Sequence, residues 1–157
     1  MRMASISLTL LTMVSTKPCL IELPRIYDPR GSLSFAQNSD QIPFEIKRVF
    51  WLYDVPGGAL RGSHSHRVAH ELIVATGGSF DVSLHDGHTS TTYTLNRPFI
   101  GLYVPPGYWR TLENFSSGSV CMVLDSILYD ESDYIRDFNE FLLWVQNHRD
   151  NPDQHHN

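Results

Sequence analysis

Short runs of β-branched and aromatic residues alternate with turn signals along most of the chain, and this pattern predicts antiparallel β-strands. The turn signals are clusters of Gly, Pro and Asp, such as Asp-Pro-Arg-Gly at 28–31 and Pro-Pro-Gly at 105–107. We expect strands at residues 20–23, 32–36, 47–53, 65–75, 79–85, 91–95, 99–104 and 119–124. Short strands without long helices between them exclude a βαβ fold and favour an all-β sandwich or barrel.

The period of the pattern changes near the C-terminus. Beyond residue 132, apolar residues recur three or four positions apart, which predicts an amphipathic helix packed on the sheet or on a partner subunit. These residues are Tyr134, Ile135, Phe138, Phe141, Leu142 and Val145. Residues 147–157 are polar, and we expect them to form a tail whose final histidines belong to a frayed end.

The first fifteen residues allow several interpretations. One arginine followed by a mildly apolar run resembles a weak secretory signal, but serines and threonines interrupt the run and no A-x-A cleavage site follows. The run is also too short to cross a membrane. The alternatives are a disordered leader, an extra edge strand, or translation from Met13. We therefore expect residues 1–15 to be a leader or additional segment before a single domain at 16–146.

Length, charge and cysteine content narrow the class of protein. The 157 residues suit one domain, and a formal net charge of -5 argues against a nucleic-acid binder. With only 12 lysines and arginines, any phosphate must be met by individually placed arginines. Cys19 and Cys121 form no CxxC motif, so we expect a reducing, cytoplasmic setting.

The segment RGSHSHRVAHELIVATGG at 61–78 carries the strongest candidate chemistry. In one continuous strand, His64, His66 and His70 share a face, and Glu71 lies on the other face unless a bulge intervenes. Paired histidines on one face suit either metal binding or proton transfer. A third interpretation is a polar strand without chemistry.

The spacing of this segment resembles the first motif of the cupin superfamily. The matching pattern is Gly58-x5-His64-x-His66-x4-Glu71-x6-Gly78, and a second motif follows as Pro105-x-Gly107-x2-Arg110-x3-Asn114. Metal-binding cupins place a histidine at the position of Arg110. Because arginine keeps its proton and offers no lone pair, we expect no metal and favour acid–base chemistry by the histidines.

Four arginines lie beside turn signals or strand edges and are candidates for an anionic ligand: Arg30, Arg48, Arg61 and Arg110. Each has the alternative of being a solvated surface charge. Concentrated around one motif in a charge-poor chain, they predict a small anionic substrate.

Longer segments carry a narrower resemblance. They are IPFEIKRVFWLYDV (42–55), RGSHSH (61–66), GLYVPPGYWR (101–110), NFSSGSVCMVLDS (114–126), YDESDYIRDFNEF (129–141) and the turn YDPRGSL (27–33). In this order they resemble the sugar 3,4-ketoisomerases, which act on dTDP-4-keto-6-deoxyglucose. The resemblance covers residues 20–143.

The resemblance implies a cupin-type double-stranded β-helix, or jelly roll, with a C-terminal amphipathic α-helix. It also implies a homodimer without a metal or organic cofactor, which moves a ketone from C4 to C3 of a dTDP-linked 4-keto-6-deoxyhexose. The product would supply 3-amino-3,6-dideoxy sugars for surface polysaccharides. Alternatives are a dTDP-sugar 3,5-epimerase of the same broad fold and a non-catalytic nucleotide-sugar-binding cupin.

The same resemblance assigns roles to individual residues. The family's catalytic base falls on His64, and His66 has a supporting or shuttling role. We expect Arg48 and Arg61 to bind the diphosphate, and Arg30 and Arg110 to frame the sugar. Tyr103 and Trp109 are candidates for stacking on the thymine or covering the sugar, with the alternative that both are core residues. Glu71 is included at the site without a role, and Tyr134 and Arg136 are expected to serve packing or dimer contact. The configuration of the product at C4 does not follow from these residues.

Overall fold

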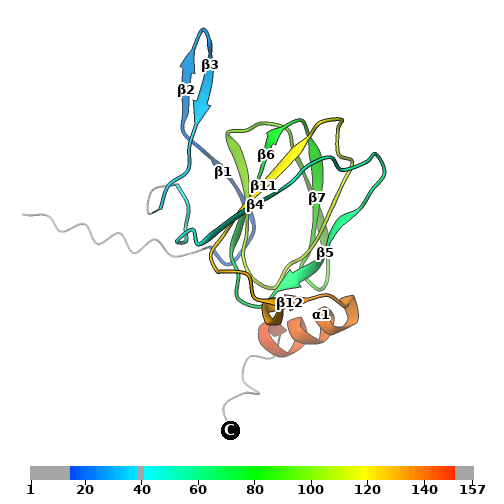
Figure 1. Cartoon of the computed structure of the whole chain (residues 1–157). Helices are drawn as coiled ribbons and strands as arrows, with labels where there is room; N and C mark the ends of the chain where they lie inside the picture. Colours follow the sequence, from blue (N-terminus) through cyan, green and yellow to red (C-terminus); the bar gives the residue numbers. More distant parts are fainter. Residues whose placement is uncertain (1–14, 39–40, 151–157) are drawn as a thin grey trace, which may run out of the picture.

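A computed structural model describes residues 15–38 and 41–150 of the chain (Figure 1). Apart from residue 15, the predicted N-terminal leader lies outside the described residues, as does the end of the predicted tail from residue 151. The described residues form β-sheets with one short α-helix near the C-terminus.

Two five-stranded antiparallel sheets make up the body of the domain. The first sheet, in spatial order, contains β1 (Cys19–Glu22), β9 (Ile100–Val104), β6 (Glu71–Gly77), β11 (Val120–Asp125) and β4 (Arg48–Leu52). The second contains β12 (Tyr134–Ile135), β5 (Arg61–His66), β10 (Trp109–Glu113), β7 (Phe80–His85) and β8 (Ser90–Leu95). The predicted cupin-type jelly roll is confirmed.

A separate hairpin of β2 (Arg25–Asp28) and β3 (Gly31–Ser34) stands clear of the two sheets, at the opposite end from α1 (Phe138–Val145) (Figure 1). Its side chains include the exposed Ile26, Tyr27 and Leu33. The hairpin therefore presents apolar surface that the body of the domain does not cover.

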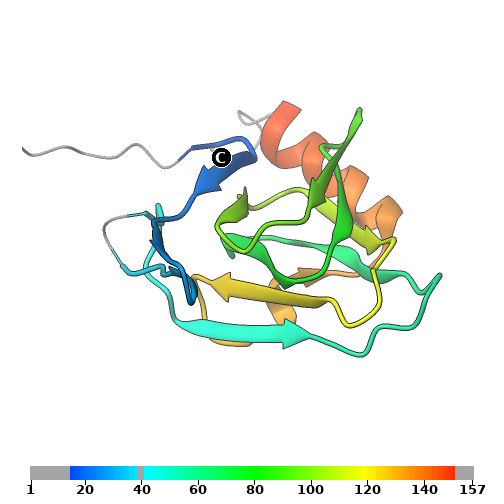
Figure 2. The ribbon, with the colours of Figure 1, turned by 90° about the horizontal axis from the view of Figure 1, so that it is seen from above.

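The two sheets face each other (Figure 2). Because side chains alternate along each strand, one set points into the interior between the sheets. On β6, Ile73 and Ala75 face this interior, where they pack with Val82 and Leu112 of the second sheet. The intervening residues of β6 pack in a second cluster on the outer face, which comprises Leu23, Ile42, Leu72, Val74, Tyr103 and Leu124. Because β6 is buried on both faces, its sequence is a continuous apolar run and does not alternate between apolar and polar residues.

Two predicted elements require correction. The single strand expected at 65–75 is two strands, because β5 ends at His66 and β6 begins at Glu71 after a loop. The helix begins only at Phe138, with the Asp137 side chain accepting a hydrogen bond from the Glu140 amide as its N-cap. Three observed strands, β2, β10 and β12, were not expected.

The residues before α1 form the short helical turn η1 (Glu131–Asp133) and then β12. In β12, Tyr134 pairs with His66 and Ile135 pairs with Ser65 of β5. Backbone pairing with an open sheet edge therefore replaces the helix that the apolar spacing predicts.

Helix α1 packs outside the second sheet. Its Phe141 and Val145 form a third cluster with Ile135, against which Trp109 also packs. The turn η2 (Gln146–Asp150) continues from the helix into the predicted tail. Within residues 15–38 and 41–150, no helix combines the length and apolarity that crossing a membrane requires.

Candidate active site

A cavity of about 220 Å³ opens between the two sheets beside β12. Its walls combine apolar core side chains with histidine, glutamate and arginine. The lining residues are Phe50, Leu52, Arg61, Gly62, His64, Glu71, Ile73, Arg110, Leu112, Val123, Tyr134 and Arg136. A larger hollow between the β2–β3 hairpin and the outer face of the first sheet is lined by no histidine or carboxylate of the described residues. The smaller cavity combines a histidine, a glutamate and three arginines.

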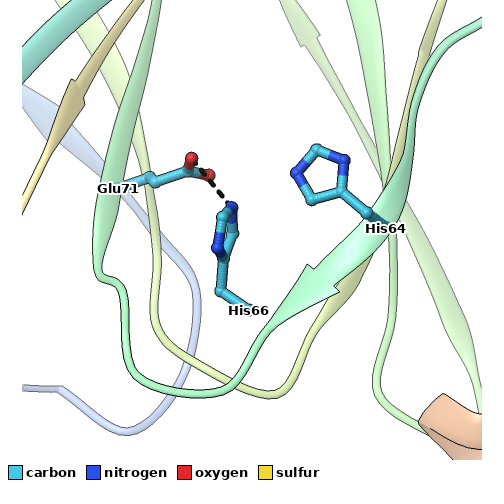
Figure 3. Close-up of side chains that lie close together, drawn as sticks. All are labelled: His64, His66 and Glu71. Atoms are coloured by element: carbon cyan, nitrogen blue, oxygen red, sulfur yellow. Dashed lines mark ion pairs between the residues drawn. The ribbon is translucent and has the colours of Figure 1, made fainter. Parts of the chain in front are cut away.

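His64, His66 and Glu71 lie close together (Figure 3), and His64 and Glu71 line this cavity. Their ligand atoms lie within 4.8 Å of one another, and His66 Nε2 is 3.3 Å from Glu71 Oε1. The loop between β5 and β6 carries the chain from the second sheet to the first. Glu71, the first residue of β6, therefore faces the histidines of β5 across the interior. The expectation that Glu71 faces away from the histidines holds only for a continuous strand and is wrong here.

Arg110 is the cation of this cluster. It comes from β10, is 2% exposed and forms an ion pair with Glu71. Its Nη2 also donates to the Tyr108 carbonyl oxygen at 3.2 Å. Burial lowers the pKa of Arg110 to about 10, which leaves the guanidinium charged at neutral pH. A cation paired with the only carboxylate of the triad does not fit a divalent metal, so we derive no step through one.

The two histidines are neutral at physiological pH. Burial, followed by the charge of Arg110, lowers the pKa of His64 to about 3. The same two causes lower the pKa of His66 to about 4, although the hydrogen bond with Asp133 opposes them. A neutral imidazole has a lone pair, so His64 is available as a base inside the cavity.

The chain after β11 contributes residues to the site that the sequence assigned to a helix. The ring of Tyr134 lies 5.0 Å from the ring of His64 and 4.4 Å from that of His66, measured between centroids. Asp133 Oδ2 lies 2.7 Å from His66 Nδ1. Tyr134 and Arg136, for which packing or dimer contact was expected, also line the cavity. The position of Tyr134 at the site follows from the pairing of β12 with β5. The apolar spacing of this segment predicts a helix instead, so the sequence pattern gives no sign of this pairing.

The predicted phosphate-binding arginines lie in different environments. Arg61 lines the cavity, and among the described residues no carboxylate lies within ion-pair distance of it. Arg48 forms an ion pair with the buried Asp125, and its Nη2 lies 3.3 Å from the Tyr134 hydroxyl. Arg61 is therefore the cation that is free to meet an anion.

Three other predicted site residues lie outside the cavity wall. Arg30 is at the tip of the β2–β3 hairpin, exposed and paired with Asp28. Tyr103 belongs to the outer cluster, where its hydroxyl lies 2.8 Å from His70 Nδ1. Trp109 packs under α1. The contacts of Tyr103 and Trp109 are those of packed core residues, which is the alternative expected from the sequence. Arg30 reaches a cavity only if the hairpin moves or if the cavity belongs to a second chain.

Comparison with known proteins gives consistent results. The family model described as FdtA: WxcM-like, C-terminal matches residues 16–146. The TDP-4-oxo-6-deoxy-alpha-D-glucose-3,4-oxoisomerase of Aneurinibacillus thermoaerophilus is 41% identical over 126 residues, which cover 80% of this chain and 91% of that protein. A solved 3,4-ketoisomerase from Helicobacter canadensis is 38% identical with a TM-score of 0.81, covering 83% of this chain and 98% of the other.

A second solved structure is a histidine-to-asparagine mutant of the 3,4-ketoisomerase QdtA from Thermoanaerobacterium thermosaccharolyticum, in complex with TDP-4-keto-6-deoxyglucose. It is 33% identical with a TM-score of 0.82, covering 85% of this chain and 96% of that one. These matches span nearly the whole described domain, so the likeness extends well beyond the histidine-rich strand. The family expected from the sequence is confirmed: the chain belongs to the WxcM-like, C-terminal (FdtA) family of sugar 3,4-ketoisomerases.

Proposed function

We propose that this chain moves the ketone of dTDP-4-keto-6-deoxyglucose from C4 to C3. The observation that carries the proposal is His64, a neutral imidazole in the wall of a cavity that also holds buried and exposed cations. The kinship with 3,4-ketoisomerases supports the choice of reaction and substrate.

His64 is the base in the proposed mechanism. It takes the proton from C3, and the electrons of the C3–H bond form a C3=C4 double bond as the C4 carbonyl becomes an enediolate oxygen. Protonated His64 then gives the proton to C4 as the C3 hydroxyl loses its own proton, and protonation of the C4 oxygen leaves a ketone at C3 and a hydroxyl at C4. The positive charges of Arg110 and Arg61 lower the energy of the enediolate, because both line the cavity in which its charge develops.

The size of the cavity indicates which part of the substrate it can hold. About 220 Å³ is less than the roughly 300 to 1,000 Å³ typical of sites for drug-sized ligands. We propose that the hexose enters the cavity while the nucleotide lies across its mouth, where Arg61 meets the diphosphate. Arg48 supports this arrangement through its contact with the Tyr134 hydroxyl, at 3.3 Å.

One incubation tests the reaction. Purified protein is mixed with dTDP-4-keto-6-deoxyglucose in D2O, and the sugar is followed by NMR. We expect the ketone at C3 and deuterium at C4. Exchange at C3 and C5 without migration of the ketone indicates a 3,5-epimerase instead, and tight dTDP binding without exchange indicates a binding protein. Prior dialysis against EDTA is expected to leave the rate unchanged, whereas a metal-dependent enzyme would lose activity.

We further propose that the protein is a cytoplasmic homodimer. Ile26 and Leu33 are exposed apolar residues of the hairpin and alternate along its strands with the residues that line the large hollow, and Trp51 is exposed on the edge strand β4. A second copy covering these surfaces removes them from water. Cys19 and Cys121 are both free thiols, which supports a reducing compartment.

A further inference from the structure

Asp133 connects the C-terminal part of the chain to the second histidine of the site. It ends η1 and directly precedes β12, and it is 5% exposed. Its Oδ2 lies 2.7 Å from Nδ1 of His66, and its Oδ1 accepts a hydrogen bond from the Val68 amide at 2.6 Å. Since a carboxylate oxygen only accepts hydrogen bonds, the short contact places the proton of His66 on Nδ1.

The other ring nitrogen of His66 is consequently a lone-pair site. Nε2 is buried and has no hydrogen-bond partner among the described residues, although it lies 3.3 Å from Glu71 Oε1. A buried polar atom without a partner is costly and calls for an explanation. Asp133, His66 and Glu71 are thus in contact one after another, from the buried end of η1 to the cavity, where Glu71 is part of the wall.

We propose that Asp133 is a positioning residue for the isomerisation, which rests on the proposed function: it holds the proton on Nδ1 of His66 and leaves Nε2 as a proton acceptor next to Glu71. When the C3 hydroxyl gives its proton to the Glu71 carboxylate, the O–H electron pair stays on the substrate oxygen and forms the second bond of the C3 carbonyl. Glu71 passes the proton to Nε2, whose lone pair forms the new N–H bond. The resulting imidazolium lies between two carboxylates, and the reverse transfer returns the proton to the oxygen at C4.

The alternative is a purely structural role. Asp133 accepts hydrogen bonds from the amides of Val68 and Ala69, so it also holds the loop between β5 and β6. A test must therefore separate the state of the His66 ring from the integrity of the loop.

The test compares Asp133→Asn with Asp130→Asn. Asparagine keeps the oxygen that accepts from the Val68 amide, and its NH2 group takes the place of Oδ2. This group donates to Nδ1 of His66 and moves the ring proton to Nε2, while the Ala69 amide loses its weaker acceptor at 3.3 Å. Asp130 lies in the same segment, where its carboxylate accepts from the Ser132 amide and hydroxyl without touching His66. The wild type and both variants are assayed with dTDP-4-keto-6-deoxyglucose. The ring nitrogens are observed by 15N NMR, with the signals of His66 assigned from a His66→Gln variant.

For Asp133→Asn we expect kcat to fall by at least about thirtyfold, with KM within about threefold. The loss is smaller than the roughly hundredfold or more of a group that transfers the proton itself, because Asp133 acts through His66. The ring proton should be on Nδ1 in the wild type and on Nε2 in this variant. Asp133→Glu, which keeps the carboxylate, should recover part of the lost kcat. Asp130→Asn should keep both the wild-type kcat and the Nδ1 proton.

Three results overturn the inference: a wild-type His66 protonated only on Nε2, an unchanged kcat in Asp133→Asn, or an equal loss in Asp130→Asn. The first needs no variant of Asp133 and decides the matter even if Asp133→Asn does not fold. A wild-type protein that leaves the ketone at C4 refutes the proposed function itself, and this outcome is read separately from the state of the ring.

Discussion

His64 meets two requirements for a base that acts on a carbon-bound proton. It lines the cavity, and burial together with the charge of Arg110 lowers its pKa to about 3, so that its lone pair is free at neutral pH. The sequence predicted this residue because the HxH motif resembles that of a known family. It did not predict the surroundings of His66, since Asp133 and Tyr134 arrive from residues far along the chain.

Replacement of His64 tests its role directly. In His64→Asn we expect a folded protein that still binds dTDP and loses at least about a hundredfold in kcat, the scale of a general-base contribution. The measurement is turnover by NMR with dTDP affinity by calorimetry. The exposed His88 provides the matched control, since His88→Asn removes an imidazole outside the cavity wall and should keep full activity. Near-normal turnover in His64→Asn would refute the assignment.

The depressed histidine pKa values also predict how stability depends on pH. In the unfolded chain a histidine binds a proton near pH 6.5, whereas folded His64 and His66 do so only near pH 3 and 4. Between these limits the unfolded state binds more protons, so folding stability falls as the pH drops from about 6.5 towards 4. The loss is at most about 1.4 kcal/mol per pH unit for each group.

Urea unfolding at pH 7, 6 and 5 measures this dependence. The His64→Asn variant lacks one of the two groups and should lose stability less steeply over the same range. A wild-type protein that is equally stable or more stable at pH 5 would contradict the burial of neutral histidines.

At the scale of elements, the strands with clear alternation or a continuous apolar run were predicted from the sequence, while those defined by pairing were not. β7 and β11 fall close to the expected ranges. β12 has two residues and exists because the edge of β5 is open to it. The apolar residues at 134–145 have helical spacing, but only residues 138–145 form the helix α1. The helix begins there because Asp137 provides its N-cap.

The contact between α1 and the turn after β7 yields a prediction about packing. Gly87 has a φ of +104°, and a Cβ at this position would lie 2.7 Å from Cγ1 of Val145. We expect Gly87→Ala to destabilise the protein by about 1 to 3 kcal/mol through backbone strain and overpacking. Gly57→Ala is the control, because Gly57 has no atom within 4 Å of an added Cβ and no positive φ.

Thermal and urea unfolding of the two glycine variants provide the comparison. The control should remain within about 0.5 kcal/mol of the wild type, as is usual for surface substitutions. Equal stability of Gly87→Ala and Gly57→Ala would mean that α1 does not pack closely on this turn.

For the whole molecule, the open question is how the β2–β3 hairpin and the hollow beside it are covered. If a second copy covers them, light scattering should give about twice the chain mass of 17.9 kDa. Leu33→Asp places a charge on the exposed hairpin and should shift the protein towards the monomer. Leu143→Asp changes an equally exposed leucine on α1 and should leave the dimer intact. A wild-type monomer would refute the proposed assembly.

The sequence by itself determined the fold class and the family, and it predicted the histidines of the site. These conclusions rest on strand periodicity, turn residues and the HxH motif with Arg110, which are local patterns that can be recognised in the sequence alone. Only the tertiary structure decided which side chains face the cavity. Alternation along the strands turns Tyr103 and Trp109 outward, and the loop at 67–70 brings Glu71 to His66. Asp133 reaches the site at the end of η1, and Tyr134 reaches it in β12. These placements depend on pairing between distant segments, which local pattern does not encode.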